Sequence, residues 1–491
     1  MRRHENAHAR SREHALPFGR LQPSFLRLSS TIRSSARSVA AEPTSEAQED
    51  TSRTVDEFKL PRMSCLCTMI LCNVFLQLSF FVVVSSSNEY AKHLGGTSTF
   101  SGVVIGIPTA VSGLALLPIM KYDRNGYKIP LHIACASAIL GHILYALAYK
   151  TNFLYLILIG RMVNGIAFTS FMYTKKYCSD SRVVGIRRRT TLASWLVMGQ
   201  GVGMTLGPFA GGLLFKIGFA NPIFNGFTSP AWIMAIVWLG FWIFSAVFFE
   251  DPPAPATRAT PLSPLPAPQE DPSVPPSTDV STAALIPEDD DTHRMTPGRW
   301  GVCVCMCWFA MTCFFVLGAW EANLPVFGAA SPTFRWTAFG AGNFIALGGI
   351  CTFPFLLLNL LVARRIQDRK LLLFGTSVGF AGLAIFLALL NTGAVRYGSL
   401  FVCWFAVALG FNLASTVTLS LLSKQLPPEW NGRTSLAIQY SNYTGRVTGA
   451  IWGGSGVAVG MSNYVGLEIA IVGIGAALFL TFWRSLKAKT G

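Results

Sequence analysis

The stretch from Gly160 to Gly212 reads GRMVNGIAFTSFMYTKKYCSDSRVVGIRRRTTLASWLVMGQGVGMTLGPFAGG. It begins with an apolar segment that carries one arginine, Arg161, and continues into a loop dense in lysine and arginine. A lone arginine inside a membrane costs roughly 2.5–3.5 kcal/mol on insertion scales, so it needs a charged partner, a water-filled cavity or a substrate. The stretch therefore predicts two membrane helices that flank a basic loop.

The second apolar segment of this stretch has small residues at short spacing. They form the pattern Gly203-x-x-x-Gly207-Pro208-x-x-Gly211-Gly212. Glycines at this spacing allow helices to approach closely, and a proline inside a helix bends it. We predict a bent helix that packs tightly on its neighbours.

The composition extends this interpretation to the whole chain. Of 491 residues, 51% are hydrophobic and 13% are charged, and the mean hydropathy is +0.45. Soluble domains carry about 25% charged residues. Apolar runs of about 20 residues, the length that spans a bilayer, recur along most of the chain. The fold class is thus predicted to be an all-α membrane protein, because the short alternating segments of a strand barrel do not occur.

Twelve apolar spans are predicted, six on each side of a polar segment. A basic tail (1–62) precedes the first half (63–249), a proline-rich linker (250–298) separates it from the second half (299–486), and residues 487–491 form a short tail. Both tails and the linker are expected to be cytoplasmic, and the first tail and the linker disordered. A mitochondrial targeting segment is an alternative for the Arg- and Ser-rich tail. The expected spans are 64–86, 99–120, 129–149, 153–174, 190–216, 230–249, 299–325, 336–362, 370–391, 398–423, 434–458 and 463–483.

The basic residues predict the orientation. With both termini in the cytoplasm, the loops on the opposite side hold only four basic residues, whereas the cytoplasmic loops hold all the others between the spans. The four are Lys92, Lys150, Arg335 and Arg396. The net charge of +15 is therefore read as membrane orientation, and no nucleic-acid partner is expected.

Metal and cofactor chemistry are not expected. Most of the 11 cysteines lie in apolar segments, and Cys303, Cys305 and Cys307 alternate in direction on a helix, which makes them a poor metal site. No phosphate-binding loop and no catalytic triad arrangement is visible, so an enzyme is not expected.

Two six-span halves joined by a linker are typical of a duplicated transporter that rocks around a midplane site. The motifs resemble those of the major facilitator superfamily (MFS). Asp123-Arg124-Asn125-Gly126-Tyr127-Lys128 is similar to the D-R-x-G-R-K gating loop of that family, with Tyr127 at an arginine position. Its second copy is more degenerate, with Arg364 at the usual aspartate and Gln367 at the usual glycine. Arg161-Met-Val-Asn-Gly165 resembles the fourth-span R-x-x-x-G motif, and the glycine-proline motif of the fifth span is complete.

A narrower resemblance points to the SPX-domain vacuolar phosphate transporters and their lysosomal relatives. It rests on Tyr173-Thr-Lys-Lys-Tyr177, on Phe224-Asn225 ahead of Pro230, and on Ser420-Leu-Leu-Ser-Lys424 followed by Gly445-Arg446-Val447. In that branch the transported species is an anion. The first tail is too short for an SPX domain, so sensing of inositol phosphates is not expected.

The MFS resemblance implies that the first, fourth, seventh and tenth spans line the cavity. The candidate binding or coupling residues are Asn73, Gln77, Arg161, Asn164, Glu321, Asn412, Lys424 and, in the eleventh span, Arg446. Asn73 and Gln77 are four residues apart and so share a helix face.

Three of these candidates have competing interpretations. Arg161 either binds substrate or pairs with a proton-carrying acid, or it is a structural arginine that holds neighbouring spans together. Glu321 is a candidate proton-coupling group, because an isolated membrane acid is often part of a proton relay. Its alternative is a structural partner for Arg446 or Arg161. Lys424 either attracts an anion or is an ordinary lysine at a loop end.

The leading hypothesis is a secondary transporter that moves a small polar, anionic solute by alternating access, with protons as one candidate coupling ion. An exporter of an amphiphilic metabolite or drug and a passive anion channel are the alternatives. We expect a monomer in the lipid bilayer of the vacuole, the lysosome or the cell surface.

Overall fold

A computed structural model describes residues 59–122, 126–180, 182–185, 188–252, 295–362, 366–426 and 430–487. The gating-loop residues Asp123 and Arg124, and most of the expected tail and linker, lie outside these residues. All regular secondary structure in the described part is helical. In the first half the helices are α2 (Met63–Phe81), α3 (Ser87–His93), α4 (Ser98–Tyr122), α5 (Lys128–Thr151), α6 (Leu154–Ala167), α7 (Ser170–Ser179), α8 (Arg189–Ile217) and α9 (Ser229–Phe248).

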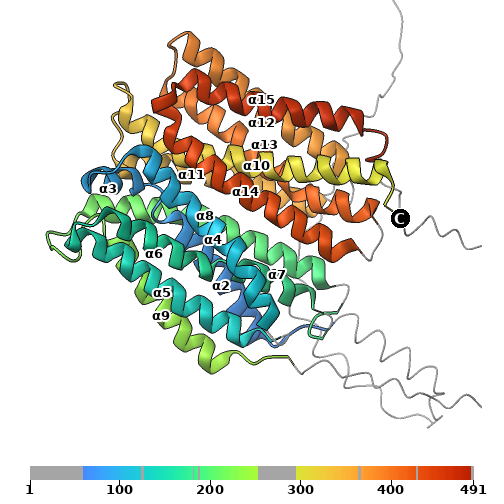
Figure 1. Cartoon of the computed structure of the whole chain (residues 1–491), viewed down its shortest axis with the longest axis horizontal. Coiled ribbons are helices and arrows are strands. Elements are labelled where there is room, and N and C mark those ends of the chain that lie inside the picture. Colours follow the sequence, from blue (N-terminus) through green and yellow to red (C-terminus); the bar gives the residue numbers. More distant parts are fainter. Residues whose placement is uncertain are drawn as a thin grey trace, which may run out of the picture. The chain divides into compact units, whose positions relative to one another are not determined.

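The second half has α10 (Pro297–Ala330), α11 (Ala338–Val362), α12 (Asp368–Asn391), α13 (Tyr397–Gln425), α14 (Asn431–Val459) and α15 (Met461–Thr481). Figure 1 shows the two halves side by side, blue to green and yellow to red. The predicted all-α membrane fold is confirmed. Ten described segments are long and apolar enough to cross a membrane, with α6 and α7 counted as one.

The two long helices that fall short of that apolar criterion are α8 and α14, of 29 residues each. They are the fifth segments of their halves, and each packs across the boundary between the halves, α8 on α11 and α14 on α4. A helix that buries its surface against protein can carry more polar residues than one that faces lipid. Their position in the fold therefore explains their composition.

Corresponding helices make corresponding contacts in the two halves. The pairs α2–α8, α4–α6, α5–α6 and α5–α9 of the first half recur as α10–α14, α11–α13, α12–α13 and α12–α15 of the second. The predicted duplication is thus visible in the packing, with the third and sixth segments of each half paired away from the partner half.

Glycines bring the boundary helices into backbone contact. A Cβ atom placed on Gly106 of α4 would lie 3.0 Å from the carbonyl oxygen of Val447 in α14. A Cβ on Gly212 of α8 would lie 2.9 Å from the carbonyl oxygen of Ala338 in α11. Only residues without a side chain allow such an approach, and dispersion contacts hold membrane helices together where water cannot drive them.

Two predicted spans are interrupted. The first is helical to Phe81, then forms turns through Val82–Ser86 before α3 begins. Three β-branched valines followed by serines disfavour a regular helix, because the valines lose rotamer freedom and serine hydroxyls compete for backbone groups. The fourth span breaks at Phe168 and Thr169, between α6 and α7.

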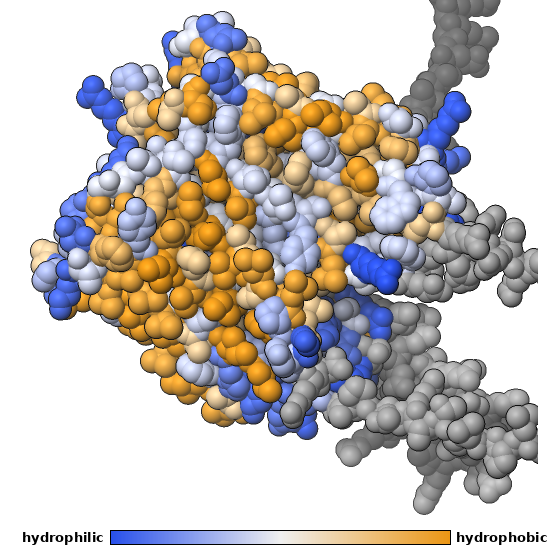
Figure 2. Space-filling model, in the orientation of Figure 1, coloured by the Kyte–Doolittle hydropathy of each residue, from blue (hydrophilic) through white to orange (hydrophobic). Residues whose placement is uncertain are grey.

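Large apolar side chains cover the outer surface of the bundle. Leu114 of α4, Ile236 of α9 and Leu480 of α15 are each more than two-thirds exposed. Figure 2 shows apolar residues across the middle of one face and hydrophilic residues toward the ends of the helices. Contiguous apolar surface of this kind is suited to lipid.

Candidate functional site

The deepest charged group of the first half is Arg161, on α6. Its side chain is fully buried. Its Nε donates to the carbonyl oxygen of Val104 in α4 at 3.3 Å, and one terminal nitrogen donates to that of Ser79 in α2 at 3.2 Å. The other terminal nitrogen has no hydrogen-bond partner. Within the described chain no carboxylate lies at ion-pair distance from Arg161, so a buried cation keeps a free donor.

The second half places its own charges opposite. Arg446 of α14 and Glu321 of α10 form a two-point ion pair, with N···O distances of 2.7 and 3.3 Å. The side chain of Glu321 is 2% exposed and that of Arg446 is 11% exposed. The structure therefore brings together two predicted site residues, and Glu321 has Arg446 as its partner rather than Arg161.

One aromatic ring joins the two arginines. The guanidinium carbon of Arg161 lies 5.7 Å from the centre of the Phe80 ring, and that of Arg446 lies 4.7 Å from the same centre. Phe81 adds a second ring 5.3 Å from Arg446. A cation over an aromatic face gains free energy, more so when both are desolvated. Phe80 is not among the residues predicted for the site, because its ring is apolar and the candidates were polar side chains.

The other predicted polar residues of the first half lie on α2, where they contact α8, and on α6. The side-chain nitrogen of Asn73 donates to the carbonyl oxygen of Leu196 in α8 at 2.8 Å. The side-chain oxygen of Asn73 accepts from the amide of Gln200 at 3.5 Å. Gln77 packs against Gly203 of α8. Asn164 is buried one turn from Arg161, and neither of its side-chain polar atoms has a partner.

The two remaining predicted residues of the second half, Asn412 and Lys424, each have a partner of their own. Asn412 of α13 is half-buried and donates to the carbonyl oxygen of Ala408, four residues earlier in its own helix, at 2.7 Å. Lys424 lies at the end of α13, where its side chain is 49% exposed and pairs with Asp368 at 2.7 Å. This placement separates Lys424 from the arginine centre and matches its interpretation as a lysine at a helix end.

A buried acid outside the predicted set lies deeper in the second half. Glu468 of α15 is fully buried and accepts a hydrogen bond from the indole nitrogen of Trp320 at 3.0 Å. Trp320 precedes Glu321 in α10, so these two side chains leave the helix in different directions, and Glu468 and Arg446 are contacted on different sides of α10. An isolated acid inside the twelfth span was visible in the sequence, but its burial was not.

The described part of the gating loop is held by two acids, one at the start of the linker and one after α7. Asp251, after α9, accepts from the backbone nitrogens of Tyr127 and Lys128 at 2.7 and 2.9 Å, which caps α5. The Tyr127 hydroxyl donates to Asp180 at 2.7 Å. Gly126, beside Tyr127, begins this described part.

Asp180 is also paired with Arg182, at 2.6 Å. Burial alone would raise the pKa of Asp180, but hydrogen bonds from Arg182 and Tyr127 outweigh it and hold the pKa below its usual value. The second half places Asp368, Ser420 and Lys424 at the corresponding ends of its helices. Each half thus has an acid–base pair at this end, Asp180 with Arg182 and Asp368 with Lys424.

The glycines of α8 face both of its long neighbours. Gly203 and Gly207 approach α2 and Gly211 approaches Val82 in the turn after it, whereas Gly212 and the carbonyl oxygen of Pro208 approach α11. The predicted close approach is thus present on both sides of this helix.

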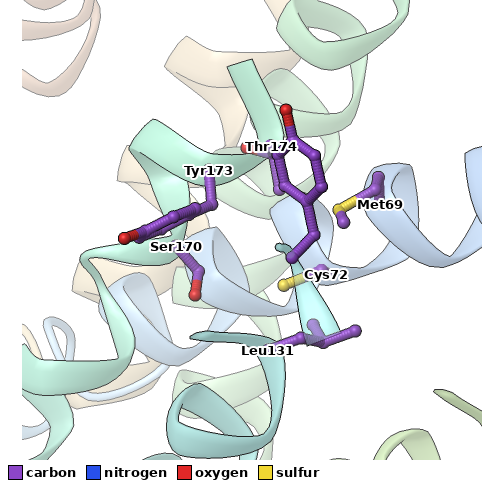
Figure 3. Close-up of a pocket in the computed structure, with 7 residues that line it drawn as sticks. Met69, Cys72, Leu131, Ser170, Tyr173 and Thr174 are labelled. Atoms are coloured by element: carbon purple, nitrogen blue, oxygen red, sulfur yellow. The ribbon is translucent and has the colours of Figure 1, made fainter. Parts of the chain in front are cut away.

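A small pocket lies toward the basic end of the first half. It is lined by residues of α2 and α7 together with Tyr127 and Leu131 at the start of α5. Figure 3 shows Ser170, Tyr173 and Thr174 around it, opposite Met69 and Cys72. None of its lining residues is charged. The two arginines are packed by protein, since the side chain of Arg161 is fully buried and that of Arg446 is 11% exposed.

Comparison with protein families agrees with this geometry. The family model described as "Major Facilitator Superfamily" matches residues 69–450. The chain belongs to the Major Facilitator Superfamily. It is an MFS secondary transporter, and the expectations of a multi-pass membrane protein and of no enzyme are confirmed.

Curated relatives support the assignment along nearly the whole chain. An uncharacterized MFS-type transporter of Schizosaccharomyces pombe is 31% identical over 455 residues, which cover 91% of this chain and 87% of the relative. An SPX domain-containing membrane protein of Arabidopsis thaliana is 33% identical over 186 residues, which cover 37% of this chain and 26% of the relative. The predicted similarity to SPX-domain membrane proteins is thus confirmed.

Solved structures share the fold at low identity. A D-xylose-proton symporter has a TM-score of 0.66 at 15% identity, covering 87% of this chain and 99% of its own. A POT family transporter in complex with 5-aminolevulinic acid has a TM-score of 0.65 at 12% identity, covering 87% of this chain and 97% of its own.

Proposed function

We propose that this MFS transporter moves a small polar anion together with protons, and that Arg161, Arg446 and Glu321 recognise the anion and couple it to the proton. The observation that carries the proposal is the buried, unpartnered nitrogen of Arg161, which shares the Phe80 ring with the Glu321–Arg446 pair. A buried donor without a partner costs free energy. An anion that accepts from it would recover this cost.

The residue types favour an oxyanion. A guanidinium presents a planar fork of donors that matches a carboxylate or a phosphate, and it does not lose its charge in a protein. Two such groups, one from each half, would both reach a solute between them once the halves part. One solved structure of the same fold, a peptide transporter POT at 14% identity, is in complex with sulfate, which is an oxyanion.

Charge balance links the anion to a proton. With Glu321 ionised, Arg446 is neutralised and Arg161 is the single uncompensated charge of the three. Protonation of Glu321 would free Arg446 for the anion, so that proton and anion enter together. A buried site favours this joint loading, because each uncompensated charge is costly there.

The direct test is flux into proteoliposomes with an imposed proton gradient. Phosphate, an organic dicarboxylate and an amphiphilic cationic dye are compared for the wild type and for Arg161→Ala. We expect one of the anions to accumulate, and the variant to lose at least tenfold of this uptake. Dye transport without anion flux would instead establish an exporter, and non-saturating flux that follows voltage would establish a channel.

Coupling is tested separately. Glu321→Gln is expected to keep anion exchange across the membrane but to lose accumulation driven by the proton gradient. Glu468→Gln is the matched control, since this acid is equally buried and bonds to Trp320 instead of an arginine. If accumulation is lost in the control and kept in Glu321→Gln, the coupling role of Glu321 is wrong.

We also propose that the end of the bundle with Asp180, Lys424 and the C-terminal end of α15 faces the cytoplasm. Basic residues gather at this end between the helices, and such residues stay on the cytoplasmic side during insertion.

A further inference from the structure

The outer flank of the second half contains a groove that the transport site does not use. It lies between α10, α12 and α15 and holds about 250 Å³. Phe309 of α10 and Phe479 of α15 form its floor, with ring centres 5.8 Å apart. Leu373, Phe380 and Gly473 on its walls are exposed. The groove is therefore apolar inside and opens sideways from two helices that cross the membrane.

Its length matches part of one lipid leaflet. The lining residues of α12 run from Leu372 to Phe380, which is about 12 Å at the rise of an α-helix. One leaflet of the hydrocarbon core is about 15 Å thick. The occupant that has access to such a groove inside a bilayer is a lipid chain.

One end of the groove is basic. Arg369 and Lys370 lie one turn before Leu372 and Leu373 on α12, and Arg484 follows Phe479 by five residues beyond α15. The two sides are joined there, because the Arg369 guanidinium lies 4.7 Å from the centre of the Trp483 ring. Clusters of arginine and lysine at the end of membrane helices attract anionic lipid head groups.

A buried polar group in the groove has no partner. The hydroxyl of Thr376 lines the groove, the residue is 8% exposed, and its oxygen makes no hydrogen bond. A buried hydroxyl without a partner is destabilising. An ester carbonyl of a lipid would accept from it, while a bare hydrocarbon would not.

We propose that this groove binds one acyl chain of an anionic phospholipid, whose head group contacts Arg369, Lys370 and Arg484. The apolar floor selects the chain, the unpartnered hydroxyl meets the ester region, and the basic end selects the charge of the head group. Such a lipid would stabilise α12 and α15 against α10 without entering the transport path.

The groove can be filled by a substitution that has room. A Cβ placed on Gly473 meets nothing within 4 Å, so Gly473→Trp should place its ring in the groove without disturbing the backbone. Gly466 is the matched control, because it lies two turns away on the same helix, is equally open and does not line the groove. Gly473→Leu is a smaller substitution of the same kind.

The measurement is native mass spectrometry of the full chain after exchange into mixed micelles with phosphatidylserine or phosphatidylcholine. We expect the wild type and Gly466→Trp to retain one phosphatidylserine, and Gly473→Trp to retain at least tenfold less, with Gly473→Leu in between. Arg369→Gln and Arg484→Gln should each lower phosphatidylserine retention about fivefold and leave phosphatidylcholine unchanged.

Two results would overturn the proposal. One is retention by both Gly473 variants at the wild-type level. The other is equal retention of the two lipids by the wild type, which would mean that the groove is an apolar surface that does not select the head group. Size-exclusion profiles confirm that each variant is folded, and the readout does not depend on transport.

Discussion

Arg446 and Glu321 form an ion pair that is nearly excluded from water. For such a pair, removing one partner and removing both have very different effects on stability. Losing one partner leaves the other charge buried and uncompensated, which costs roughly 3–5 kcal/mol, whereas replacing both is far less costly. We expect Arg446→Gln to lower the unfolding temperature markedly and Arg446→Gln with Glu321→Gln to recover most of the loss. Thermal unfolding in detergent, with exposed Arg433→Gln as the control, measures this. A double variant no more stable than the single one would contradict the coupling.

The hydrogen bonds of Asp180 predict that the stability of the fold depends on pH. Because hydrogen bonds from Arg182 and Tyr127 depress its pKa in the folded state, its contribution to stability is present above the unfolded pKa and is lost as the pH falls through the folded pKa. We expect Asp180→Asn to be less stable than the wild type by roughly 1.5–3 kcal/mol at neutral pH. The difference should shrink below about pH 4. Unfolding temperatures measured from pH 7 to pH 3 test this, and a constant difference would refute it.

At the scale of the element, α8 depends on the absence of side chains. A Cβ on Gly203 would lie 2.7 Å from the Cβ of Gln77 and 2.9 Å from the carbonyl oxygen of Val74. We expect Gly203→Leu to push α8 from α2 and to cost at least about 1–3 kcal/mol. Gly240→Leu on α9, where a Cβ meets nothing within 4 Å, is the control. Comparable unfolding temperatures for the two variants would show that the contact between α8 and α2 at Gly203 contributes little to stability.

At the scale of the whole transporter, the boundary between α4 and α14 must open and close. The hydroxyls of Thr99 and Ser455 lie 3.1 Å apart across it, within reach of a disulfide if both become cysteine. We expect oxidised Thr99→Cys with Ser455→Cys to lose transport and a reductant to restore it. Each single variant with oxidant is the control for the 11 native cysteines. Unchanged transport in a fully cross-linked sample would mean that this contact is static.

Much of the fold could be predicted, because lipid imposes strong constraints. Twelve apolar segments follow from length and hydropathy, since every backbone group in a bilayer must be satisfied within a helix. The breaks at Val82–Ser86 and at Phe168 were not predicted, because hydropathy does not register the loss of helical hydrogen bonds within an apolar run. The polarity of α14 made sense only once its burial against α4 and α10 was visible.

By itself the sequence determined the class of protein, the two halves and the family, and it made Arg161 a candidate, because membrane insertion penalises a charge wherever it lies along a span. The tertiary structure decided which charges meet. Glu321 pairs with Arg446, Lys424 pairs with Asp368 at a helix end, and Phe80 joins the two arginines. These contacts join residues that are 56 or more positions apart. Such partners are selected by the packing of helices in three dimensions, which the spacing of residues along one helix does not encode.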